Sequence, residues 1–87
     1  MANEYALDPR EVRLSAAEVR YLAAVVEEGR GDRAAGEYAE GVRTHPELRA
    51  RVVGALERVG FARHYDGAPT RAGIVWHDAV FRRKGGQ

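Results

Sequence analysis

The chain has 87 residues, of which 45% are hydrophobic and 31% charged, a balance typical of one small globular domain. It contains no cysteine, which excludes a disulfide framework, thiolate catalysis and cysteine-based metal sites. A chain this short has little room for both a core and a deep substrate cleft, so we expect it not to be an enzyme.

Neither a membrane span nor a signal peptide is predicted. The longest apolar run covers residues 21–26, far short of the roughly 20 residues that a transmembrane helix needs. Residues 1–13 are rich in charged and polar side chains and lack the apolar segment of a signal peptide. We therefore expect a cytoplasmic protein.

Charge is unevenly distributed along the chain, although the net charge is only +1. Residues 1–42 carry nine acidic side chains against five arginines, whereas residues 43–87 carry nine basic side chains against four acidic ones. Nearly all the basic residues are arginine, which suits bidentate contacts to phosphate and guanine. The second half can therefore present a basic face to an anionic partner, although solvated surface charges would give the same pattern.

Two helices are predicted in the first half. Ser15 and Glu18 form a capping-box pattern, and apolar residues then recur with helical spacing, which predicts a helix over residues 15–28. Asp32 is the expected N-cap of a second, short helix. Its apolar stripe consists of Ala35, Tyr38, Ala39 and Val42. Two glycines weaken this second helix, so it needs tertiary packing.

A third helix is predicted at about 45–59. Thr44 and Glu47 match a second capping box, Pro46 fits the first turn, and Gly60 is the stop. The expected buried face consists of Leu48, Val52, Ala55, Leu56 and Val59. The opposite, exposed line consists of Glu47, Arg51, Gly54 and Arg58, with Arg49 and Ala50 beside it.

The remaining segments predict a hairpin and a last helix. Residues 61–65 alternate apolar and polar as in a strand, and Asp66-Gly67 is a typical hairpin turn. Thr70 is the expected cap of a helix that begins at Arg71. From 73 to 81 helix and strand signals compete, and we favour the helix. Residues 1–13 are an N-terminal arm, which Leu7, Val12 and Leu14 could pin to the body, and 82–87 a basic tail.

Three short motifs in this order resemble a known fold. They are Leu14 to Glu18 before the first helix, Leu56-Glu57-Arg58-Val59-Gly60-Phe61 after the third, and Thr70-Arg71-Ala72-Gly73 before the last. Together they are similar to the winged helix-turn-helix domain, most of all its MarR-type members. The resemblance implies a mostly α fold with a small β-hairpin: a three-helix core, a short wing and a C-terminal helix, within a domain of residues 14–81.

The resemblance also implies a transcriptional regulator that binds double-stranded DNA as a homodimer, with the third helix in the major groove and a short wing at about 62–71. The candidate DNA-binding residues are Thr44, His45, Arg49, Arg51, Arg58, Arg63, His64 and Arg71. The alternative function is a winged-helix module that binds another protein instead of DNA. One contiguous exposed face that holds all five arginines of this set, Arg49, Arg51, Arg58, Arg63 and Arg71, favours the first function. The same arginines scattered over the surface or paired with carboxylates favour the second.

No cofactor or metal site is expected. His45, His64 and His77 are too far apart in the sequence to form a recognisable zinc motif, and no catalytic motif occurs. His77 is expected to be a partly buried, hydrogen-bonded core residue that faces away from Asp78. The aromatic residues expected in the core are Tyr38, Phe61, Tyr65 and Trp76.

Overall fold

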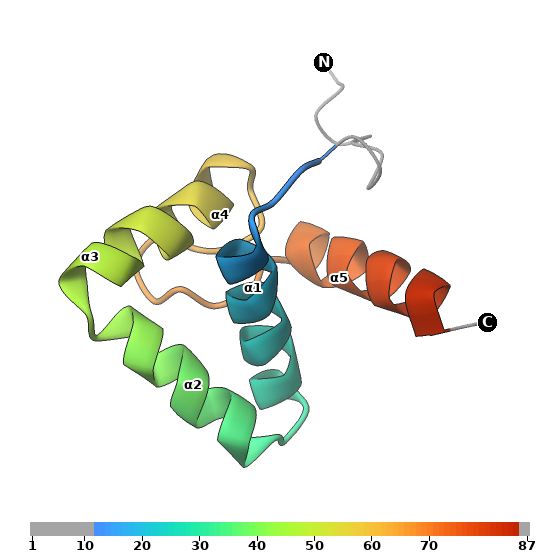
Figure 1. The fold of residues 1–87 in the computed structure, drawn as a ribbon, viewed down its shortest axis with the longest axis horizontal. Helices are drawn as coiled ribbons and strands as arrows, with labels where there is room; N and C mark the ends of the chain where they lie inside the picture. Colours follow the sequence, from blue (N-terminus) through green and yellow to red (C-terminus); the bar gives the residue numbers. More distant parts are fainter. Residues whose placement is uncertain (1–11, 86–87) are drawn as a thin grey trace.

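The computed structural model describes residues 12–85 (Figure 1). This part of the chain forms a compact all-α domain. Its helices are α1 (Ala16–Gly29), α2 (Arg33–Arg43), a helix in three consecutive pieces, α3 (Pro46–Leu48), η3 (Arg49–Val53) and α4 (Gly54–Arg58), and α5 (Arg71–Gly85). None of these helices is long and apolar enough to cross a lipid bilayer.

The start of α1 follows the predicted capping box. The Glu18 backbone N–H donates to Ser15 Oγ at 3.2 Å, and the Ser15 N–H donates to Glu18 Oε1 at 2.8 Å. One face of α1 then enters the core, where Tyr21 and Leu22 are fully buried. The prediction of a helix over residues 15–28 is confirmed to within one residue at each end.

The second helix also begins where the sequence predicts. Gly31 has a φ of 101°, which turns the chain, and the Asp32 carboxylate accepts the Ala35 N–H at 3.1 Å. α2 packs against α1 (Figure 1). Ala39 is fully buried, and the Glu28 side chain of α1 lies 3.2 Å from the position of a Cβ on Gly36. Small side chains therefore let these helices approach closely.

The third helix departs from the prediction in its phase. The Gly54 N–H donates to the carbonyl of Arg49, five residues back, so one turn is a π-helix that holds an extra residue. That extra residue brings Val53 into the core beside Val52, whereas the predicted buried face omitted it. Leu56, which the prediction included, is fully buried.

No β-strand or wing is seen between residues 59 and 70, so the predicted hairpin is wrong. Ala62 and Pro69 form a single antiparallel bridge, flanked by one hydrogen bond on each side. Pairing does not continue into a ladder, because the Ala68 N–H donates to the Asp66 carboxylate and the Arg63 carbonyl accepts the Gly67 N–H instead. Gly67 takes a φ of 70° in the turn, as the Asp-Gly dipeptide suggested.

The last segment is a helix, which confirms the preference for helix over strand. The Thr70 hydroxyl accepts the Gly73 N–H at 3.1 Å and caps α5. Of the described helices, only α1 packs against α5, which extends away from the rest of the domain (Figure 1). α5 continues into the predicted basic tail as far as Gly85.

The core lies between α1, α2, the third helix and the first turns of α5. Phe61 and Trp76 are buried there with ring centroids 5.6 Å apart, and Tyr38 packs partly against it. Tyr65 is 74% exposed, so its prediction as a core residue is wrong. Val12 of the predicted arm and Leu14 directly after it pack on the core, as expected; most of the arm, with Leu7, lies outside the described residues.

Candidate nucleic-acid interface

The outer side of the third helix carries two arginines free for a partner. Arg51 and Arg58 are exposed, and neither makes a hydrogen bond or ion pair with any other side chain or backbone group that the structure describes. The Arg58 Nη1 lies over the helix, 3.8 Å from the position of a Cβ on Gly54. In the described structure, therefore, neither arginine is paired with a carboxylate of its own helix such as Glu47 or Glu57.

The turn before this helix differs from the predicted capping box. Thr44 ends α2, and its hydroxyl donates to the Glu40 carbonyl at 2.9 Å. His45 is the actual N-cap, because its Nδ1 accepts the Leu48 N–H at 3.3 Å. The two side chains predicted to contact DNA here are thus both engaged in ending one helix and starting the next.

Arg49 points along the protein surface rather than away from it. Its Nη2 donates to the main-chain carbonyl of His64 at 2.6 Å, and its side chain is half-buried. The imidazole Nδ1 of His64 lies 2.9 Å from Glu57 Oε1, on the next stretch of the same helix. Glu57, which sequence reasoning did not assign to the site, is therefore part of it.

Arg63 is paired, whereas Arg71 is not. The Arg63 guanidinium binds Asp66 in a two-point contact, Nε–Oδ1 at 3.2 Å and Nη2–Oδ2 at 2.7 Å. The same guanidinium lies over the ring of Tyr65, 5.2 Å from its centroid. Arg71 is exposed at the start of α5 without a partner among residues 12–85. The eight predicted residues therefore divide into free cations and groups with structural partners.

A cleft of about 410 Å³ lies beside the third helix and is bordered on one side by His64. Its lining is mostly apolar along the helix and charged where the loop meets it. The lining residues are Pro46, Arg49, Ala50, Val53, Gly54, Glu57 and His64. Since Gly54 has no side chain, the helix backbone borders this cleft directly.

A buried hydrogen bond holds the base of the loop. The Tyr21 hydroxyl of α1 donates to the Gly67 carbonyl at 2.8 Å, and Arg43 lies 3.5 Å from the same hydroxyl. Burial raises the pKa of Tyr21, and its contact with Arg43 offsets this only in part. The loop is thus tied to the first helix across 46 residues of sequence.

We expect Tyr21→Phe to lower the free energy of unfolding by about 1–2 kcal/mol, because the Gly67 carbonyl is left buried without its donor. Chemical denaturation monitored by circular dichroism measures this change. Tyr38→Phe is the matched control, since the hydroxyl of Tyr38 makes no hydrogen bond with residues 12–85 and should be dispensable. Equal stability of wild type and Tyr21→Phe would contradict the role given to this bond.

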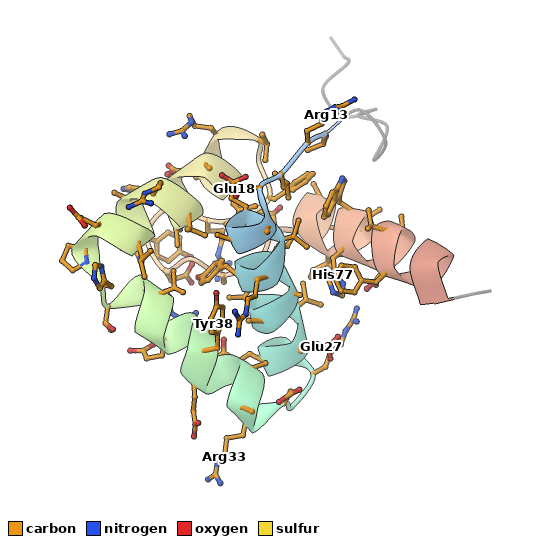
Figure 2. All side chains as sticks on the ribbon, in the orientation of Figure 1. Arg13, Glu18, Glu27, Arg33, Tyr38 and His77 are labelled. Atoms are coloured by element: carbon orange, nitrogen blue, oxygen red, sulfur yellow. The ribbon has the colours of Figure 1, made fainter. Side chains whose placement is uncertain are left out.

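A second charged network joins α5 to the end of α1. His77 is 3% exposed and lies on the side of α5 that faces α1 (Figure 2). Its Nδ1 donates to Asp78 Oδ1 at 3.0 Å, and Arg30 Nη2 donates to Asp78 Oδ2 at 2.8 Å. The prediction that His77 is a buried core residue is confirmed; the prediction that it faces away from Asp78 is wrong, because the carboxylate reaches back to the ring.

Protonation of Asp78 at low pH should weaken this network. The hydrogen bonds from Arg30 and His77 lower the pKa of Asp78 from 3.8 to about 2. A carboxyl group with a depressed pKa stabilises the fold above its unfolded value and loses that contribution as the pH falls through its folded value. We therefore expect Asp78→Asn to be less stable than wild type above pH 4, with the difference shrinking towards pH 2.

Denaturant unfolding at a series of pH values measures this difference. Glu37→Gln is the control, because Glu37 is exposed and has no partner among residues 12–85. It should change neither the stability nor its pH profile. A gap between Asp78→Asn and wild type that stays constant from pH 6 to 2 would exclude the proposed titration of Asp78.

The described residues contain no group of three His, Asp or Glu side chains that could hold a metal ion. Comparison with known proteins adds no constraint on function. No family model matches the chain, and no curated protein or solved structure matches it. The likeness to MarR-type domains therefore stays a prediction from three short motifs, and the chemistry of the described surface carries the functional argument.

Proposed function

We propose that the protein binds double-stranded DNA through its third helix and acts as a small transcriptional regulator of the helix-turn-helix kind. The observation that carries this proposal is the pair Arg51 and Arg58, exposed on one helix with no carboxylate partner among the described residues. Guanidinium groups in this state are available to phosphates and to guanine.

The arrangement of the helices supports the same proposal. α2 and the third helix follow one another through the short turn at Thr44 and His45, and both pack on α1. A helix-turn-helix domain offers its second helix to the major groove in this way. Arg71 adds a further free cation at the start of α5, and the loop from 62 to 69 takes the position in sequence where a wing would follow.

Counterion release gives the proposal a measurable signature. Each phosphate neutralised by an arginine adds about 0.9 to the slope of log affinity against log salt. We expect wild-type protein to bind a generic duplex with an affinity that falls steeply between about 50 and 200 mM salt. The double variant Arg51→Ala/Arg58→Ala should bind at least about tenfold more weakly at low salt, with a slope smaller by about 1.8.

Fluorescence anisotropy with a labelled duplex measures both quantities. Arg33→Glu is the matched control, because it changes the net charge by as much as the double variant does. Arg33 is exposed at the first position of α2 and points away from the domain at the end far from α4 (Figure 2). It should bind the duplex almost as wild type does; binding that is insensitive to salt, or equal losses in both variants, would refute the proposed surface.

A second function, docking on another protein, is favoured by a different observation. Among the described residues, three large hydrophobic side chains are exposed, namely Tyr65 at 74%, Val75 at 58% and Phe81 at 40%. Exposed aromatic residues are frequent in protein interfaces. If the duplex experiment shows no salt-sensitive binding, docking on another protein becomes the better description. If the exposed hydrophobic residues instead joined two copies of a DNA-binding form, duplex binding would still depend on salt.

A further inference from the structure

Two side chains of the third helix converge on one residue of the loop. Arg49 holds the main-chain carbonyl of His64 at 2.6 Å, and Glu57 holds its imidazole at 2.9 Å. We call these three residues the His64 clamp. The two helix residues act on different parts of His64, so the clamp fixes both the backbone position and the ring orientation.

The clamp acts where the loop has no other described anchor on this helix. Its base is held by the Ala62–Pro69 bridge and by the bond from Tyr21 to Gly67. The tip, residues 64–66, lies beyond that single bridge and is not part of a β-ladder. The tip is closed on itself by the hydrogen bond from the Gly67 N–H to the Arg63 carbonyl and by the Arg63–Asp66 pair. The side chains of Arg49 and Glu57 add the contacts that fix its position relative to the third helix.

The clamp also borders the cleft beside the third helix. Arg49, Glu57 and His64 all line this space of about 410 Å³. The separation between helix and loop is therefore set by contacts that involve Arg49, and the loop carries Arg63 and the exposed Tyr65 next to the clamp. A change at Arg49 would move these neighbours relative to the free arginines of the helix.

We infer that Arg49 is a positioning residue rather than a DNA contact: it holds the loop tip at a set distance from the helix face that carries Arg51 and Arg58. This inference rests on the proposed function for its effect on DNA, whereas the clamp itself is a property of the protein alone. Arg49 then contributes to affinity by ordering the loop before binding, and a preordered surface loses less conformational freedom when a partner binds.

The first experiment measures loop order without DNA. In ¹⁵N relaxation measurements the amides of residues 64–66 should have order parameters near 0.85 in wild type and below about 0.6 in Arg49→Ala. Arg49→Lys keeps a charged donor for the carbonyl and should restore part of this order. His64→Ala keeps the carbonyl and loses only the contact with Glu57, so the tip should remain more ordered than in Arg49→Ala.

The second experiment separates positioning from phosphate contact. Arg49→Ala should weaken duplex binding by about tenfold without changing the salt slope, whereas Arg51→Ala should reduce that slope by about 0.9. If Arg49→Ala leaves the tip ordered, or reduces the slope as Arg51→Ala does, the inference is wrong. If wild type binds no duplex, the proposed function fails, and the relaxation measurement still decides whether Arg49 orders the loop.

Discussion

Gly73→Ala is expected to lower the free energy of unfolding by about 3 kcal/mol, at the upper end of the usual cost of overpacking. A Cβ on Gly73 would run into the carbonyl oxygen of Phe61 and would lie 3.1 Å from the carbonyl carbon and the Cα of the same residue. These are backbone atoms, so no rotamer change relieves the collision. The Phe61 carbonyl is also fixed, because it accepts the Thr70 N–H at 2.9 Å.

The contact at Gly73 brings the start of α5 against Phe61, in the segment that follows the third helix. Moving α5 outwards to fit a methyl group would separate Trp76 from Phe61, whose rings are 5.6 Å apart in the core. Chemical denaturation measures the loss. Gly41→Ala is the matched control, because a Cβ there meets nothing within 4 Å and alanine favours a helix, so stability should rise by up to about 1 kcal/mol.

Equal stability of Gly73→Ala and wild type would mean that the junction between Phe61 and α5 adapts at little cost. The position of α5 would then be set by other contacts, of which the pair Arg30–Asp78 is the most direct. A double variant, Gly73→Ala/Asp78→Asn, distinguishes these cases. If the junction at Gly73 is rigid, the second change should add only the loss measured for Asp78→Asn alone.

Leu56→Ala is expected to cost about 3–4 kcal/mol of unfolding free energy, within the range for large-to-small changes in a packed core. Leu56 is fully buried on the inner side of the third helix, between Val52 and Val53 of the π-turn and the first helix. Removing its branched side chain leaves a cavity that a short helix lying against α1 and α2 cannot close without moving as a whole.

Thermal and denaturant unfolding measure this loss, and Arg58→Ala is the matched control on the opposite side of the same helix. Because Arg58 is exposed and without a described partner, that variant should change stability by less than about 0.5 kcal/mol. A small effect of Leu56→Ala would mean that the third helix is held by its ends instead of its core face. The two variants together separate the stability of this helix from its proposed contact with DNA.

Local signals predicted the helix boundaries well. Ser15, Asp32 and Thr70 each accept the backbone N–H three positions on, as the capping patterns indicate. Gly60, with a φ of 81°, ends the third helix where the sequence places the stop. Such contacts lie within one helical turn, so they depend on neighbouring residues and not on the rest of the fold.

The sequence predicted the residues of the candidate site less completely than the helix boundaries. The exposure of Arg51 and Arg58 follows from the helical pattern, because the buried residues of the same helix leave only one side for them. The engagement of Arg49 with His64 does not, since it depends on how the loop folds back across 15 residues of sequence. The prediction for Tyr65 was wrong for a related reason, because the alternation of apolar and polar residues does not distinguish a strand from an irregular loop.

By itself, the amino-acid sequence determined four helical segments, most of their caps and the exposed line of arginines, because each depends on spacing within a few turns. Only the tertiary structure decided the π-turn that buries Val53, the single bridge in place of the hairpin, and the partners of Arg49 and Arg30. Those outcomes depend on which distant backbone groups come within hydrogen-bonding or packing distance, and a linear pattern does not contain that information.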